Sequence, residues 1–166
     1  MKVITCQFKL HGQAILDIFN EAIANSTALY EYEPRNLATI QAWFKLKTER
    51  NYPIIGIEDS GRLTGFATYG AFRTYAAYQY SVEHSVYVET KFRRRGIGQK
   101  LLQELILLAK QQNYHTMIGG IDAENTISIK LHRSLGFTHC GSIKQVGFKF
   151  GKWLDLEFYQ LILSTS

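Results

Sequence analysis

This sequence is poor in proline and cysteine, and each scarcity excludes a class of protein. Its two cysteines, Cys6 and Cys140, are too few for a disulfide framework and lack the spacing of metal ligands. We therefore expect two buried free thiols and no metal site. Proline occurs only at positions 34 and 53, and no internal repeat, low-complexity tract or linker-like stretch divides the chain. A chain of 166 residues of this kind predicts one domain over residues 1–166.

Long hydrophobic runs are absent as well. No apolar stretch reaches the length that spans a bilayer. The segment from Met1 to Cys6 alternates polar and apolar residues, where a secretory signal needs an uninterrupted apolar run. Hydrophobic residues make up 46% of the chain and charged residues 20%, which is a globular and not a disordered composition. We expect a cytoplasmic protein that has no membrane partner.

The net charge of +5 raises the question of a nucleic-acid partner. The densest basic run is Lys91–Arg95, which only Phe92 interrupts and which directly precedes Gly96. Such a compact run beside glycine indicates a local phosphate site, whereas nucleic acid favours an extended basic face. No predicted helix carries such a face, so we expect no nucleic-acid partner.

Hydrophobic periodicity predicts the element order β-α-α-β-β-β-α-β-α-β-β. This order indicates an α/β fold, in the form of an α+β mixed sheet with helices on both faces. Strands are expected over residues 3–8, 53–58, 62–72, 82–88 and 115–121, with two more around 147–153; helices are expected over 14–23, after position 34, over 97–108 and over 127–135.

The segment Arg93–Gly98 joins a predicted strand to a predicted helix. The first N–H groups of a helix lack internal partners, the helix dipole favours an anion there, and glycine lets a phosphate approach closely. A dinucleotide-binding loop would need a third glycine where Leu101 stands, and the Gly-Lys-Ser/Thr of a P-loop is missing. The segment therefore predicts a different phosphate ligand, with a simple turn before a helix as the alternative.

Two motifs carry a resemblance to a known family. Arg93-x-x-Gly96-x-Gly98 resembles the acetyl-CoA motif of the GNAT N-acetyltransferases. The segment 125–137, with Asn125 and Ser128 near its start, is similar to a second motif of that family. Segments 26–30, 52–54, 82–88 and 147–155 resemble the subgroup that acetylates phosphinothricin or methionine sulfoximine. The resemblance implies the GNAT fold, acetyl-CoA as co-substrate, no metal, a small-molecule amine as acceptor, and a homodimer.

The resemblance also implies which residues hold acetyl-CoA. Asn125 is a helix N-cap on the structural interpretation, and on the family interpretation it also contacts the pantetheine or phosphate arm. The implied cofactor-binding residues are Val86, Tyr87, Val88, Arg93, Arg94, Arg95, Gly96, Ile97, Gly98, Gln99, Asn125 and Ser128.

Acetyl transfer to an amine needs a base, a polarised carbonyl and protonation of the departing thiolate. Glu83 is the candidate base, because its strand approaches the phosphate loop, and it shares one strand face with Ser85 and Tyr87. The alternative is an exposed strand carboxylate. The resemblance implies that the Val88 amide receives the carbonyl oxygen. His132 stands where many relatives have tyrosine. It could donate the proton or only pack beside the cofactor, and the thiolate could leave unaided.

Arg73 follows a strand and could bind the carboxylate of an amino-acid substrate, as the resemblance implies, or be an exposed arginine. Aromatic and apolar side chains could surround the rest of the acceptor, with His84 and Ser85 beside Glu83; they are Leu29, Tyr30, Tyr75 and Tyr78. Phe150 stands where phosphinothricin-selective relatives carry histidine, which favours methionine sulfoximine or sulfone without excluding phosphinothricin.

Two other functions stay open at this point. One is acetylation of a protein N-terminus, which needs an open peptide groove, whereas the tyrosine-rich segments predict a closed pocket. The other is a non-catalytic acetyl-CoA sensor, which the histidine at position 132 favours and the presence of Glu83 opposes.

Overall fold

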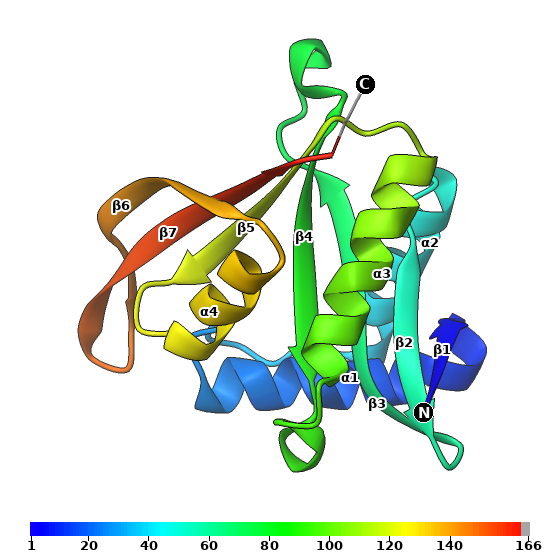
Figure 1. The fold of residues 1–166 in the computed structure, drawn as a ribbon. Helices are drawn as coiled ribbons and strands as arrows, with labels where there is room; N and C mark the ends of the chain where they lie inside the picture. The colour runs from blue at the N-terminus through cyan, green and yellow to red at the C-terminus, as the bar shows by residue number, and fades with distance from the viewer. Residues whose placement is uncertain (164–166) are drawn as a thin grey trace.

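The computed structural model describes residues 1–163. Along the chain its elements alternate as the hydrophobic pattern predicts (Figure 1). They are β1 (Lys2–Thr5), α1 (Phe8–Asn25), α2 (Leu37–Glu49), β2 (Ile54–Asp59), β3 (Arg62–Ala71), the 3₁₀ turn η1 (Ala76–Tyr78), β4 (Ser81–Val88), the 3₁₀ turn η2 (Thr90–Phe92), α3 (Ile97–Gln111), β5 (Thr116–Asp122), α4 (Thr126–Ser134), β6 (Thr138–Lys149) and β7 (Lys152–Ile162).

The strands form a mixed sheet in the order β1-β2-β3-β4-β5-β7-β6. The pair β4–β5 is parallel, and the other neighbours are antiparallel. The β6–β7 hairpin turns at Phe150 and Gly151, which both have a positive φ, as a tight hairpin turn requires.

Two apolar cores cover the two faces of this sheet. On one face, α3 buries Leu101, Leu102 and Leu105 against strand residues such as Tyr69 and Met117. On the other face, the buried stripes of α1 and α2 pack against residues of β2 and β3. Helix α4 lies on the α3 face, since its apolar residues contact the first core. This packing of helices on both faces confirms the predicted fold class.

The sheet opens between its two parallel strands. Strands β4 and β5 are paired only from Ser81–Thr116 to Glu83–Ile118, and beyond that point they separate, as Figure 1 shows. The outer edge of β5 is covered by β7 over its whole length. The second half of β4 therefore has a neighbour on the β3 side only.

Two sequence-based expectations are corrected by the structure. The first strand ends at Thr5 and a helix begins at Phe8. Gln7 is the N-cap residue of this helix, and its backbone N–H donates to the Nδ1 atom of His11 one turn later. Cys6 is buried as expected, but Cys140 is exposed. Cys140 lies on β6, which forms the edge of the sheet and is exposed along most of its length.

Candidate active site

A cleft of about 1050 Å³ occupies the gap between β4 and β5. Its walls come from the C-terminal end of α1 and the segment 25–30, from β4 and β5, and from the starts of α3 and α4. Within it the structure brings together most of the residues that the sequence singled out. They are Leu29, Tyr30, Glu83, His84, Ser85, Val86, Tyr87, Val88, Arg93, Arg94, Gly96, Ile97, Gly98, Gln99, Asn125, Ser128 and His132.

Strand β4 turns two backbone N–H groups into this gap. Glu89 donates to Thr64 at 2.8 Å and Phe72 to Ser81 at 3.3 Å, so odd-numbered residues of β4 bond to β3. In an antiparallel ladder, the backbone N–H and C=O groups of the intervening residues point away from this partner strand, toward the other side. The N–H groups of Val86 and Val88 therefore face the side on which β5 has moved away. Unpartnered N–H groups of this kind are suited to holding an oxyanion.

The start of α3 presents backbone N–H groups without helical partners at one end of the cleft. The first helical bond runs from the N–H of Lys100 to the carbonyl of Gly96 at 3.1 Å, and no side chain caps the helix. The three preceding N–H groups, from Ile97 to Gln99, are therefore available to a ligand. Gly96 enables this entry with a left-handed φ of 76°, which glycine adopts without strain.

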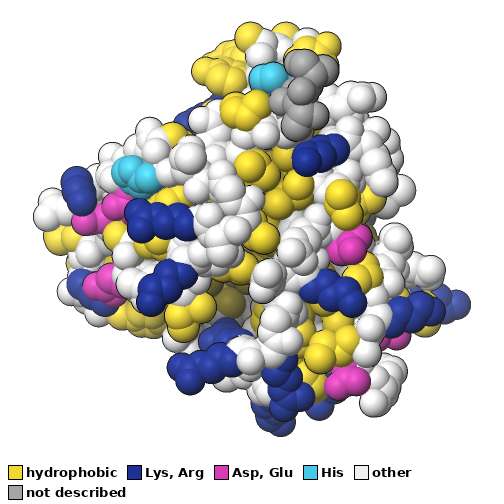
Figure 2. Space-filling view, in the orientation of Figure 1, with side chains coloured by type: hydrophobic (Ala, Val, Ile, Leu, Met, Phe, Trp, Pro, Cys, Tyr) yellow, Lys and Arg dark blue, Asp and Glu magenta, His cyan; other side chains and the backbone are white. Residues whose placement is uncertain are grey.

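The basic residues before α3 separate into two groups. Arg93 and Arg94 line the cleft, and the Nε atom of Arg93 donates to the carbonyl of Val88 at 3.3 Å. Arg95 lies outside the lining, with its guanidinium 5.2 Å from the centre of the Phe92 ring. In Figure 2, Lys and Arg side chains gather over this end of the molecule, where a phosphate would enter.

Glu83 projects from β4 onto one face of the gap. Its Oε2 atom lies 3.3 Å from the position that a Cβ atom of Gly120 would take. Burial raises the pKa of Glu83, and the charge of Arg73 partly opposes this shift. A carboxyl group with a raised pKa is a stronger base than an ordinary glutamate, which suits it to accept a proton.

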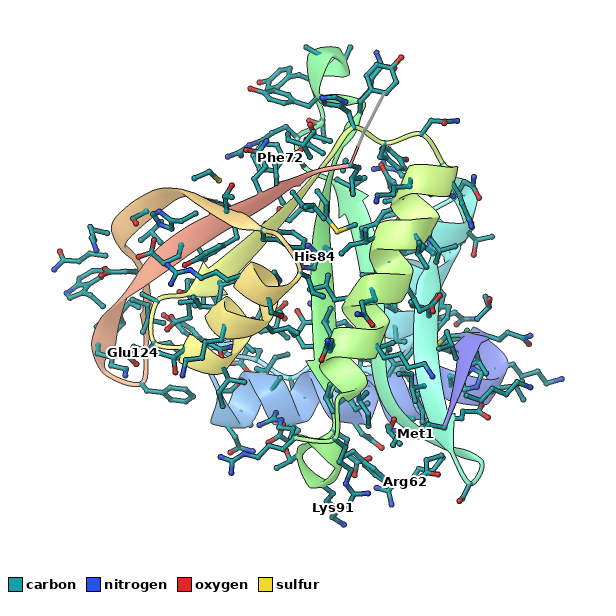
Figure 3. All side chains as sticks on the ribbon, viewed as in Figure 1. Met1, Arg62, Phe72, His84, Lys91 and Glu124 are labelled. Atoms are coloured by element: carbon teal, nitrogen blue, oxygen red, sulfur yellow. The ribbon has the colours of Figure 1, made fainter. Side chains whose placement is uncertain are left out.

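His84 projects onto the opposite face, midway along β4 (Figure 3). Its Nε2 atom lies 2.8 Å from the Nε2 atom of His132 on α4, and both rings are buried. Burial lowers the pKa of His132, while a hydrogen bond to the Ser128 carbonyl opposes this shift. Asn125 starts the same helix by accepting a hydrogen bond from the Ser128 N–H at 3.2 Å.

Two glycines of β5 make room for these groups, and the sequence analysis missed them. A Cβ atom on Gly119 would lie 2.7 Å from Cε1 of His84, and one on Gly120 would touch Glu83. Neighbouring strand residues face opposite sides, so one glycine serves each face of the gap. The signal was present, because a glycine pair inside a strand often marks a close approach.

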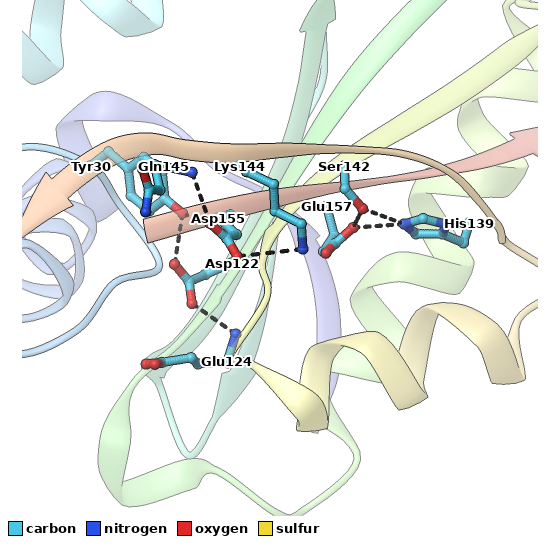
Figure 4. A network of polar contacts seen from close by, with 9 residues as sticks. All are labelled: Tyr30, Asp122, Glu124, His139, Ser142, Lys144, Gln145, Asp155 and Glu157. Atoms are coloured by element: carbon cyan, nitrogen blue, oxygen red, sulfur yellow. Dashed lines mark hydrogen bonds and ion pairs between the residues drawn. The ribbon is translucent and has the colours of Figure 1, made fainter. Parts of the chain in front are cut away.

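The segment 25–30 is held against the sheet by polar contacts. The Tyr30 hydroxyl donates to Asp122 at 2.6 Å, as Figure 4 shows. The Nζ atom of Lys149, on β6, donates to the carbonyls of Ser26 and Leu29, both at 2.7 Å. The sequence analysis did not assign roles to Asp122 or Lys149, because their partners are distant in sequence.

Three of the expected substrate residues lie outside the cleft lining. Arg73, Tyr75 and Tyr78 belong to the exposed connection between β3 and β4, and Tyr75 is 76% exposed. Arg73 is close enough for its charge to act on Glu83. In Figure 2, hydrophobic side chains gather on this protruding connection.

The described residues 1–163 contain neither a candidate metal cluster nor a candidate membrane-spanning helix. No group of three His, Cys, Asp or Glu side chains in this part of the chain could hold a metal ion. No helix there is long and apolar enough to cross a membrane.

An open sheet with an anion-binding helix start and with acid–base groups on both faces of the gap suits group transfer from a phosphorylated carrier. A family model described as an acetyltransferase (GNAT) domain matches residues 13–157. The chain is 46% identical over 153 residues to the L-methionine sulfoximine/L-methionine sulfone acetyltransferase of Pseudomonas aeruginosa (strain PAO1), a match covering 92% of this chain and 89% of that protein.

Solved structures agree with this match. An N-acetyltransferase from Staphylococcus aureus Mu50 superposes with a TM-score of 0.97 at 45% identity, covering 98% of each chain. A GNAT superfamily phosphinothricin acetyltransferase from Sinorhizobium meliloti, in complex with acetyl-CoA, gives 0.94 at 34% identity, covering 98% of this chain and 88% of that one. The chain belongs to the GNAT family of acetyltransferases.

Proposed function

We propose that this protein transfers the acetyl group of acetyl-CoA to the α-amino group of a small amino-acid analogue. Methionine sulfoximine or methionine sulfone is the favoured acceptor and phosphinothricin the alternative. The observation that carries the proposal is the gap between β4 and β5, where backbone N–H groups lie between Glu83 on one face and two histidines on the other.

The cleft offers a suitable partner for each part of acetyl-CoA. The free N–H groups at the start of α3, with Arg93 and Arg94, suit the diphosphate. The N–H of Val88 faces the gap and suits the oxygen that becomes negative when the thioester is attacked. Asn125 and Ser128 lie along the same cleft, where the pantetheine arm would pass. The cleft residues thus fit an extended, phosphorylated acetyl donor, and no metal is needed in this chemistry.

Glu83 acts as the base in this proposal. It takes a proton from the acceptor ammonium, directly or through a water molecule, so that a neutral nitrogen attacks the thioester carbon. The raised pKa of Glu83 supports this role. On the opposite face, His132 supplies a proton to the departing sulfur, which completes the transfer without leaving a free thiolate.

The acceptor would lie on the Glu83 side of the gap. Leu29 and Tyr30 form part of the cleft wall there, and Lys149 holds their segment in place. Arg73 would bind the α-carboxylate. Its charge lowers the pKa of Glu83, so it lies close enough to the base to reach an acceptor bound there. The match to a methionine sulfoximine/sulfone acetyltransferase supports this acceptor class.

We also propose a cytoplasmic homodimer in which residues 1–166 form one domain. The continuous sheet supports a single domain. The exposed Tyr75, Tyr78 and Tyr80 support a second copy packing against the β3–β4 connection. Such packing would enclose Tyr75 and Arg73 beside the acceptor. The two free cysteines are compatible with a reducing compartment.

A turnover assay tests the proposed reaction. Thiol released from acetyl-CoA is measured against methionine sulfoximine, methionine sulfone, phosphinothricin, simple amines and a peptide N-terminus. We expect the free amino-acid analogues to give the highest kcat/KM. Preference for the peptide would replace the proposal by protein acetylation, and acetyl-CoA binding without turnover on any amine would indicate a sensor.

A further inference from the structure

The contact between His84 and His132 contains more hydrogen-bond acceptors than the two N–H donors of a pair of neutral imidazole rings can satisfy. The Nε2 atoms are 2.8 Å apart, and the rings are stacked with centroids 5.0 Å apart. The Nδ1 atom of His84 lies 3.1 Å from the carbonyl of Ile118, and that of His132 lies 2.7 Å from the carbonyl of Ser128. All four ring nitrogens are therefore engaged.

Counting protons on these nitrogens determines the charge of the pair. A carbonyl oxygen only accepts hydrogen bonds, so the two Nδ1 contacts are hydrogen bonds when each Nδ1 atom carries a proton. A neutral imidazole has one N–H, which leaves both Nε2 atoms as bare acceptors facing each other. Two lone pairs at that distance repel in a buried site, whereas one added proton between them makes a hydrogen bond. The geometry fits two rings with three protons.

We infer that His84 and His132 share one proton between their Nε2 atoms, and that the pair acts as the single acid that protonates the departing thiolate. The inference rests on the proposed acetyl transfer. The sequence singles out His132 on α4 as a candidate acid, and His84 becomes its partner in holding the proton.

Burial limits the pair to this one proton and makes it easy to release. Burial, together with the charge of a protonated His132, holds the pKa of His84 far below its usual value, so a second proton does not bind. Burial also lowers the pKa of His132. A proton that is held by a short hydrogen bond but disfavoured by burial is readily given to a stronger base, such as a thiolate.

No other charged group shares the surroundings of the pair in the described residues. Glu83 leaves β4 on the opposite face, and the Asp122 carboxylate of β5 accepts from Tyr30 and the Glu124 N–H. On α4, Lys130 is exposed and Arg133 stacks over a tyrosine ring. The buried residues of α3 are apolar, and the ring of Phe137 packs against both imidazoles.

The protons balance over one turnover. When the C–S bond breaks, its electron pair stays on sulfur, and the thiolate takes the shared proton to form the S–H bond. The pair is left as two neutral rings. The acceptor nitrogen, which begins as an ammonium, loses one proton before it attacks and a second on becoming an amide, and both protons pass in turn through Glu83 to solvent. The pair, which lines the cleft, regains a proton from solvent before the next turnover.

The first test follows the proton in the free protein and does not depend on activity. Imidazole ¹⁵N resonances are measured by NMR as a function of pH. We expect the two Nε2 signals of His84 and His132 to titrate together, and to lie between the protonated and bare values when the pH is below the ordinary pKa of histidine, because burial lowers the pKa of both rings. In His84→Asn, the His132 Nε2 signal should move to an independent titration. Nε2 signals that stay fully bare down to the lowest pH at which the protein remains folded, or two independent titrations in the wild type, would overturn the shared proton.

The second test measures the acid role through the pH profile of kcat. His84→Asn and His132→Asn should each lower kcat by about tenfold to a hundredfold, the low end for a general acid because a thiolate leaves readily. The alkaline limb caused by losing the shared proton should disappear in both variants. The affinity for acetyl-CoA, measured by calorimetry, should change less than about threefold. An unchanged kcat and alkaline limb in folded variants would remove the pair from proton donation.

Two controls separate the possible failures. His139→Asn changes a histidine of β6 that bonds to Glu157 outside the cleft lining and should leave the pH profile unchanged; the same loss there would show that the effect is not specific to the pair. An inactive wild type with a clear shared NMR titration would reject the proposed reaction and the acid role while leaving the shared proton in place.

Discussion

At the scale of single residues, the proposed reaction depends on a carboxylate whose pKa is shifted by its position in the gap. Burial raises the pKa of Glu83, and a base must be deprotonated to act, so activity should rise as the pH rises through that value. Glu83→Gln should lower kcat about a hundredfold or more at neutral pH. Steady-state kinetics measure the loss, and calorimetry should show acetyl-CoA affinity near that of the wild type.

Glu49→Gln is a matched control for this change, because Glu49 lies on the exposed surface of α2 beside Lys45. It should leave the kinetics unaltered. If Glu83→Gln keeps both the maximum rate and the acidic limb of the pH profile, the base lies elsewhere or the acceptor arrives already neutral.

Arg73 is expected to act on both the acceptor and the base. A charge-assisted pair with the α-carboxylate contributes about 1.5–3 kcal/mol. Arg73→Ala should therefore lower kcat/KM for methionine sulfoximine about tenfold to a few hundredfold, with little effect on its decarboxylated amine. Because the charge of Arg73 lowers the pKa of Glu83, the variant should also shift the acidic limb of the profile to higher pH.

Arg73→Lys tests the geometry of this contact. A lysine keeps the charge but not the planar fork of donors, so it should restore the position of the acidic limb more fully than it restores kcat/KM. Equal losses for the acid and the amine in Arg73→Ala would show that Arg73 supports the fold or acetyl-CoA binding and not the carboxylate.

At the scale of elements, the start of α3 is expected to contribute to acetyl-CoA binding and not to the stability of the fold. A Cβ atom on Gly98 would have its nearest neighbours at 3.7 and 3.8 Å, which is ordinary contact. Gly98→Val should therefore melt close to the wild type but bind acetyl-CoA at least about tenfold more weakly, because its side chain covers the N–H groups. Calorimetric titration measures the affinity, with Gly141→Val on the exposed strand β6 as control. Undiminished affinity in folded Gly98→Val would exclude this helix start from the site.

The β6–β7 hairpin is expected to hold the acceptor segment through Lys149. Its ammonium donates to two carbonyls of the segment 25–30. Lys149→Met should lower the free energy of unfolding by about 2 kcal/mol and raise KM for the acceptor more than for acetyl-CoA. Urea unfolding and steady-state kinetics measure these effects. Lys144→Met, an exposed lysine on the same strand, provides the comparison, and equal effects of both changes would contradict the role of Lys149.

The sequence predicts most elements because each has a strong local signal, such as the apolar stripe of α3. It also predicts Glu83 and the phosphate loop, since strand alternation and a glycine before a helix are local features. The glycine pair Gly119 and Gly120 inside a strand signals a close approach, but the partners of these glycines and of Lys149 depend on which strands lie side by side, which one sequence does not reveal. The histidine pair joins residues that are 48 positions apart, and only the packing of α4 brings them together.

At the scale of the whole molecule, the central claim is that the gap between β4 and β5 is where the acetyl group is transferred. The most direct measurement is a crystal structure of the protein with acetyl-CoA and methionine sulfone. We predict the diphosphate at the start of α3, the thioester oxygen within hydrogen-bond distance of the Val88 N–H, and the acceptor nitrogen on the Glu83 side. A thioester outside the gap, or an acceptor bound on the side of the histidine pair, would contradict the account.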